Sequence, residues 1–278
     1  MTSEQTPVPG VRRRRALRAG AGRPPWLLFL PALIGVAFLV LPFAGLLAST
    51  PWSELGGRFT DPGVLAALWL SLATATVATV VSLLFGVPLA WLLARTEFPG
   101  RRVIRALVTV PLVIPPVVGG VALLFAWGRS GLLGRHLDTW FGLTLPFTPV
   151  AVVLAQVFVA MPFLVISVEG ALHGVDRRYE EAAATLGADR TTVFTRVTLP
   201  MVLPGVGAGA VLCWARALGE FGATITFAGN FPGTTRTMPL AVYMAMQRDP
   251  ETAVVLSLLL LLVSLVVLVT LRERWVSA

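Results

Sequence analysis

The stretch EAAATLGADRTTVFTRVTLP, residues 181–200, is a polar island between two strongly apolar segments of the chain. Its first six residues are rich in strong helix formers and predict a short helix. Gly187 can adopt the left-handed φ that ends such a helix, and Asp189 can cap a second helical piece by accepting its free backbone N–H groups. Pro200 and Pro204 mark the entry of the next apolar segment. The sequence therefore predicts two short helical pieces joined at a glycine, although an ordinary cytoplasmic loop can have the same composition.

The rest of the composition is that of an integral membrane protein. Hydrophobic residues make up 56% of the 278 residues, only 13% are charged, and the mean hydropathy is +0.81, whereas about a quarter of the residues of a soluble domain are charged. Runs long enough to cross a bilayer predict six spans at about 26–48, 64–94, 103–127, 150–168, 201–228 and 253–271. The predicted fold is an all-α transmembrane domain, residues 26–278, with a basic tail at 1–25 and a loop at 169–200.

Arginines are unevenly distributed over the predicted loops. All 22 basic side chains are arginine: sixteen lie in the two tails, in the loop after the second span and in the 169–200 loop, five lie in the remaining loops, and Arg216 lies within a span. The positive-inside rule therefore predicts that the 169–200 loop and both termini are cytoplasmic. Membrane topology accounts for the net charge of +8, and we expect no nucleic-acid partner.

Missing residue types exclude several functions. The chain contains no lysine, and a P-loop needs a lysine that reaches the phosphates of the nucleotide. If ATP drives the protein, another chain must therefore bind it. The single cysteine, Cys213, excludes an intrachain disulfide and a CxxC metal site, and its apolar surroundings predict a packing role. We expect no cofactor.

Two spans contain residues that are unusual at membrane depth. The third span carries Pro111, Pro115 and Pro116, which predict either a kinked helix or a broken one beside a pathway. The fifth contains ARALGEFGATITFAGN, residues 215–230, in which Arg216 and Glu220 are four residues apart and share a helix face. They are either a structural ion pair or part of a gate. Thr224 and Thr226 add hydroxyl groups to this stretch. Gly219 and Gly222 allow close helix packing or a break in the helix.

Two motifs carry a resemblance to a known family. The first motif has fixed spacings: Glu181-Ala182-Ala183, then three residues, Gly187, nine residues, Val197, one residue and Leu199-Pro200. This pattern resembles the EAA loop of ABC importer permeases, which has isoleucine where this chain has Val197. Residues 215–243 resemble molybdate-type permeases of the sulfate, thiosulfate and molybdate branch. The likeness extends from about Val64 to the end of the chain, and the first span lies outside the shortest members. We call residues 169–200 the EAA-like loop.

The resemblance implies a fold, partners and site residues. The fold is that of a type I ABC importer permease in a bacterial or archaeal cell membrane. The partners are a second permease copy, two ATPase subunits, an extracytoplasmic oxyanion-binding protein, membrane lipid and molybdate, with sulfate, thiosulfate or tungstate as alternative cargo. The residues expected to couple to the ATPase are Glu181, Ala182, Ala183, Gly187, Leu199 and Pro200, and those expected at the pathway or gate are Arg216, Glu220, Thr224 and Thr226. The chain itself is then a transport subunit and not an enzyme.

Two other classes of protein fit parts of the sequence. An ion-coupled secondary transporter would need buried carboxylates at broken helices, and Glu220 is the one convincing intramembrane acid. An intramembrane serine protease would need a serine near a histidine. Ser130 lies in a GxSG string, but the predicted topology places His173 on the opposite side, and His136 shares a short loop with Ser130 that would protect a nucleophile poorly.

Overall fold

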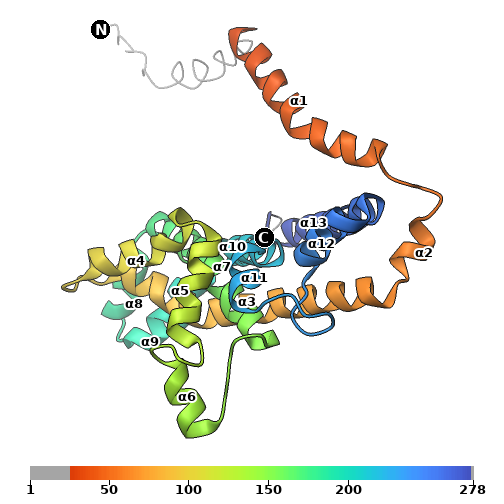
Figure 1. Cartoon of the computed structure of the whole chain (residues 1–278). Helices are drawn as coiled ribbons and strands as arrows, with labels where there is room; N and C mark the ends of the chain where they lie inside the picture. The colour runs from red at the N-terminus through yellow and green to blue at the C-terminus, as the bar shows by residue number, and fades with distance from the viewer. Residues whose placement is uncertain (1–25, 277–278) are drawn as a thin grey trace, which may run out of the picture. The chain divides into compact units, whose positions relative to one another are not determined.

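The computed structural model describes residues 26–276 (Figure 1). The predicted basic tail, residues 1–25, lies outside the described residues. The chain divides into two units between Thr50 and Pro51. The first contains α1, Trp26–Ala48, an apolar helix whose bounds coincide with the first predicted span and which contains Pro31 and Pro42.

The second unit contains all the remaining elements, and the described residues include no strand. Its elements are α2 Leu55–Phe59, α3 Pro62–Arg95, α4 Arg101–Val113, α5 Pro116–Trp127, α6 Gly134–Phe141, α7 Pro149–Gly174, α8 Arg178–Thr185, α9 Arg190–Val193, the π-helical turn η1 Phe194–Thr198, α10 Leu199–Leu218, α11 Gly222–Phe227, α12 Met238–Arg248 and α13 Pro250–Val276.

Five helical segments of the described chain are long and apolar enough to cross a membrane. They are α1, α3, α7, the continuous segment Arg190–Leu218 and α13, and the shorter apolar helix α5 is a sixth. The all-α membrane fold is thus confirmed.

The third and fifth predicted spans are not continuous helices. Residues 103–127 are divided between α4 and α5, because Ile114 is extended at φ −73° and ψ 143°, the conformation favoured before a proline. Residues 201–228 are divided at Gly219–Phe221 into α10 and α11. The third span is therefore broken at the residue before Pro115 and not merely kinked, and its place beside a pathway stays a prediction.

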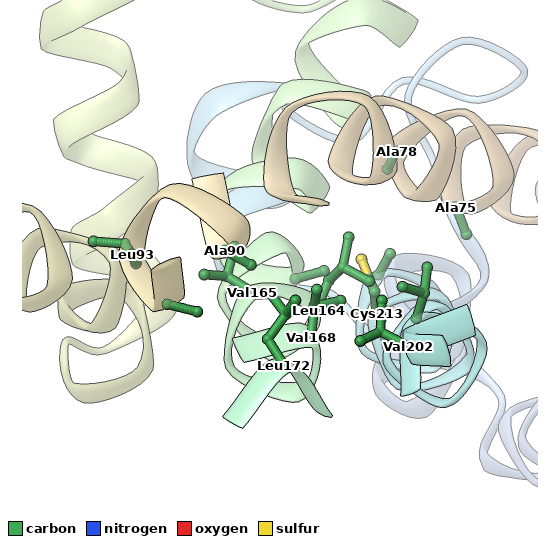
Figure 2. Close-up of a cluster of buried hydrophobic side chains, with 14 of the residues drawn as sticks. Ala75, Ala78, Ala90, Leu93, Leu164, Val165, Val168, Leu172, Val202 and Cys213 are labelled. Carbon is green, nitrogen blue, oxygen red and sulfur yellow. The ribbon is translucent and has the colours of Figure 1, made fainter. Parts of the chain in front are cut away.

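Helix α7 lies at the centre of the second unit and packs against α3 and α10. Figure 2 shows the buried side chains that these three helices share. From α3 come Ala75, Ala78, Ala90 and Leu93, from α7 Leu164, Val165, Val168 and Leu172, and from α10 Val202 and Cys213. Small residues on α3 let the backbones approach closely, and the buried Cys213 is a packing residue as predicted.

The two ends of this bundle differ. Where α3 and α7 end and α10 begins, Arg95 of α3 contacts Glu180 of α8; we call this the EAA end. At the opposite end, Arg58 forms ion pairs with Glu54, Asp249 and Glu251. The predicted cytoplasmic loops around 95–101 and 175–198 thus share one end of the bundle.

Candidate functional site

The EAA-like loop folds locally as the sequence predicts. Helix α8 ends in a Schellman motif, in which Ala188 N–H donates to the Ala183 carbonyl (3.1 Å) and Gly187 N–H to that of Ala184 (3.0 Å). Gly187 has φ +88°, which other residues rarely adopt. A Cβ at this glycine would meet nothing within 4 Å, so the backbone conformation and not crowding requires glycine.

Asp189 caps the second helical piece, α9. Its Oδ1 accepts a hydrogen bond of 3.3 Å from the backbone N–H of Thr192. Hydrogen bonds from the side chain and then the backbone of Thr192 hold the pKa of the Asp189 carboxyl below its ordinary value. The predicted cap is therefore confirmed.

The inner face of α8 is tied to the bundle through Glu180. Its Oε1 accepts hydrogen bonds from Arg95 Nε (3.1 Å) and from Thr198 Oγ1 (2.9 Å). The Arg95 side chain is only 6% exposed and that of Glu180 19%. We call Arg95, Glu180 and Thr198 the Glu180 clasp, since it joins α8 to the end of α3 and to the residue before α10. Sequence reasoning missed Glu180, and its position beside Glu181 was the only local signal.

The outer face of α8 presents apolar side chains to solvent. Tyr179, Ala182, Ala183 and Leu186 are spaced three and four residues apart and share one face. Tyr179 is 57% exposed and Leu186 88% exposed. We call these four residues the outer stripe. Glu181 is exposed on a different part of the helix surface, and Ala183 is only partly exposed, so Glu181 and Ala182 are the accessible members of the predicted coupling residues of α8.

Leu199 and Pro200 lie apart from that stripe, at the start of α10. Because Pro200 has no N–H, it cannot donate the regular hydrogen bond to the carbonyl four residues earlier. The chain instead forms η1, in which Leu199 N–H donates to the Phe194 carbonyl. Leu199 and Pro200 therefore belong to the joint between the EAA-like loop and α10.

Arg216 and Glu220 pair as the sequence predicts. Arg216 Nη2 lies 2.6 Å from Glu220 Oε2, and the side chains are 27% and 1% exposed. Oε1 of Glu220 also accepts a hydrogen bond of 2.9 Å from Ala223 N–H, in the first turn of α11. Glu220 thus bridges the break between α10 and α11, while Arg216 keeps the more accessible side of the pair.

The two broken spans pack against each other. A Cβ on Gly120 of α5 would lie 2.8 Å from the Ala223 carbonyl oxygen of α11, and one on Gly222 would lie 2.9 Å from Pro116 Cβ. Thr226 donates to the Gly222 carbonyl (2.7 Å), whereas the Thr224 side chain is fully buried, with no hydrogen-bond partner in the described residues. The predicted close approach at Gly222 is confirmed, and the irregular backbone lies against protein.

Within residues 26–276 no side-chain hydrogen bond joins Ser130 to either histidine considered for a serine protease. His136 contacts the side chains of Arg135 (3.2 Å) and Trp140. His173 lies in the last turn of α7, whereas Ser130 precedes α7. Within residues 26–276 there is also no cluster of His, Cys, Asp and Glu that could hold a metal ion.

Comparison with known proteins gives a consistent picture. The family model for "Binding-protein-dependent transport system inner membrane component" matches residues 86–278. The molybdenum transport system permease protein ModB of Mycobacterium tuberculosis is 49% identical over 251 residues, covering 90% of this chain and 94% of that protein. Its namesake in Escherichia coli K12 is 44% identical, covering 78% and 95%. A probable sulfate transport system permease protein of Marchantia polymorpha is 32% identical, covering 83% and 81%.

Solved structures agree on the fold. A bacterial ABC transporter for import of the acidic polysaccharide alginate matches with a TM-score of 0.73 at 18% identity, covering 90% of this chain and 95% of that chain. The alginate transporter in complex with a periplasmic protein matches with a TM-score of 0.72 at 19% identity, covering 89% and 93%. At these identities the likeness establishes the importer permease fold.

Proposed function

The chain belongs to the family of binding-protein-dependent transport system inner membrane components, and from that premise we propose that it is the permease subunit of an ATP-driven importer of molybdate. The permeases named for molybdenum transport are 43–49% identical to it, whereas the probable sulfate permeases are 32% identical. This difference supports molybdate over sulfate or thiosulfate as cargo. Tungstate has the same charge and shape as molybdate, so it is expected to compete.

The exposed outer stripe of α8 is the observation that carries the coupling role. Leu186 is 88% exposed and Tyr179 57% exposed on the same face, and apolar side chains gathered on one exposed face mark a surface for a protein partner. The neighbouring alanines allow a partner to approach closely, and the exposed Glu181 can pair with a basic group on that partner. We assign this partner as the separate ATPase subunit, because the chain has no lysine from which to build a P-loop.

The Glu180 clasp supports a route from the ATPase to the membrane helices. Movement of α8 is resisted by hydrogen bonds to Arg95 at the end of α3 and to Thr198 at the start of α10. A displacement of the outer stripe therefore moves the ends of both helices. In this mechanism ATP binding closes two ATPases, pulls on the EAA-like loops of two permease copies and opens the pathway between the copies outward.

Of the four predicted pathway residues, we assign contact with the cargo to Arg216 and a structural role to the other three. Arg216 is 27% exposed and can meet an oxyanion, and its pairing with Glu220 keeps the attraction weak enough for release. Glu220, Thr224 and Thr226 support α11 from inside the chain. An extracytoplasmic oxyanion-binding protein delivers the cargo, and the arginine distribution supports cytoplasmic termini and a cytoplasmic EAA-like loop.

Uptake in cells that express the whole transporter tests the cargo. We expect molybdate uptake that excess tungstate blocks and excess sulfate spares. Sulfate uptake that molybdate does not inhibit would contradict the proposed cargo. Uptake that continues without the ATPase but collapses with the proton gradient would instead indicate the ion-coupled secondary transporter.

A further inference from the structure

A cavity of about 350 Å³ lies at the EAA end, behind α8 and away from the outer stripe. It is open on one side and is lined by the end of α3, the inner face of α8, α9 and η1. Three arginines line it, namely Arg95, Arg177 and Arg190, together with one acid, Glu180. None of the functions proposed above uses this space.

The cavity carries excess positive charge. Arg95 is neutralised by Glu180 at 3.1 Å. Arg177 donates to the Ala94 carbonyl (3.3 Å), which leaves its charge uncompensated, and within residues 26–276 neither Arg177 nor Arg190 forms an ion pair. The carboxylate nearest in sequence to Arg190, that of Asp189, instead accepts the capping hydrogen bond from Thr192. Two guanidinium groups are therefore available to an anion.

Part of the lining is aromatic. Trp91 and Phe194 line the same cavity and pack edge to face, with ring centroids 5.8 Å apart. Trp91 precedes Arg95 by one turn of α3, so the lining changes from apolar to cationic over about 6 Å along the helix. This change occurs at the last turn of a membrane-spanning helix, where tryptophan typically lies at the level of the lipid headgroups.

We propose that this cavity binds the phosphate headgroup of an anionic phospholipid. Arg177 and Arg190 would hold the phosphate, and Trp91 and Phe194 would contact the glycerol and the first acyl carbons. Basic pockets between membrane helices on the cytoplasmic side suit such headgroups. A free oxyanion would use the two arginines but would leave the aromatic wall without a function. The inference depends on the membrane fold and not on the identity of the cargo.

Native mass spectrometry of the permease–ATPase complex tests the site. The complex is reconstituted in phosphatidylcholine nanodiscs with increasing phosphatidylglycerol and then released with its bound lipid. The double substitution Arg177→Gln and Arg190→Gln should weaken phosphatidylglycerol retention by at least about tenfold, since each charge-assisted hydrogen bond corresponds to about a tenfold change in affinity.

The matched control removes the same charge from the same loop. Arg178 and Arg196 are exposed, as Arg177 and Arg190 are, but do not line the cavity, so Arg178→Gln with Arg196→Gln should retain lipid as the wild type does. Equal retention in all three complexes would overturn the proposal. A second result would also overturn it: inorganic phosphate binds the complex in phosphatidylcholine through these arginines, and added phosphatidylglycerol does not displace it. The cavity would then bind a free anion and not a lipid. If the double variant fails to assemble, Arg190→Gln alone provides the test.

Discussion

Arg95 Nε donates a hydrogen bond of 3.1 Å to Glu180 Oε1, although the two residues are 85 positions apart in the sequence. This contact fixes the first turn of α8 to the last turn of a membrane-spanning helix. Because Thr198 donates to the same oxygen, one carboxylate connects the EAA-like loop to both α3 and α10. Replacing Glu180 should therefore affect both stability and coupling, whereas replacing the exposed Glu181 should affect coupling alone.

Glu180→Gln should lower both stability and transport. The substitution removes the charge that neutralises Arg95, whose side chain is 6% exposed, at a cost of about 1–3 kcal/mol. Thermal unfolding of the purified permease should shift to lower temperature, and molybdate uptake should fall. Glu181→Gln is the matched control, because Glu181 is exposed, and it should leave the unfolding temperature unchanged. An equal shift in both variants would contradict the clasp.

Arg95 and Glu180 should behave as a coupled pair. Removing both charges, with Arg95→Gln and Glu180→Gln together, should destabilise the protein by less than the sum of the single changes, because neither charge is then left buried alone. Free energies of unfolding from the four members of this cycle give the coupling. Additive effects would show that the contact contributes nothing to stability.

Gly187→Val should uncouple transport while leaving the protein in the membrane. The φ of +88° costs a non-glycine residue about 1–2 kcal/mol, and a β-branched residue is especially unfavourable there. The angle between α8 and α9 should therefore change. Gly174→Val tests the size change alone, since a Cβ at either glycine meets nothing within 4 Å and Gly174 has no positive φ. Normal uptake by Gly187→Val would contradict a role for this angle in coupling.

The cap of α9 should titrate at acidic pH. The folded-state pKa of Asp189 is lowered by its hydrogen bonds from Thr192, so its stabilising effect is complete above the ordinary pKa of about 4 and is lost as the pH falls through the lowered value. Hydrogen exchange at the Thr192 amide, corrected for the intrinsic effect of pH, should accelerate in that range. Asp189→Asn keeps a capping oxygen and should remove this pH dependence.

Exchanging the charges at Arg216 and Glu220 should not restore transport. Arginine at position 220 cannot accept the hydrogen bond of Ala223 N–H, so the start of α11 is left without its cap. Glu220→Gln keeps an accepting oxygen and should be more stable than Glu220→Leu by about 1 kcal/mol. Full transport by the charge-exchanged protein would mean that the ion pair alone matters.

The sequence predicts those features of the structure that depend on residues close together in the chain. The left-handed Gly187, the Asp189 cap and the Arg216–Glu220 pair all follow from spacings of a few residues. The break at Ile114 also follows from the neighbouring Pro115, whereas the close approach of α5 and α11 at Gly120 and Gly222 depends on tertiary packing. The Glu180 clasp could not be predicted, since its arginine comes from another span. The coupling and pathway roles remain predictions.

Coupling between the exposed surface of α8 and the ATPase is the central claim, and transport by reconstituted proteoliposomes tests it most directly. Molybdate uptake and ATP hydrolysis are measured together for the wild type and for Glu181→Ala. We predict that Glu181→Ala abolishes uptake while the complex stays assembled and its unfolding temperature is unchanged. Uptake per ATP equal to that of the wild type would contradict the assignment of α8 as the coupling helix.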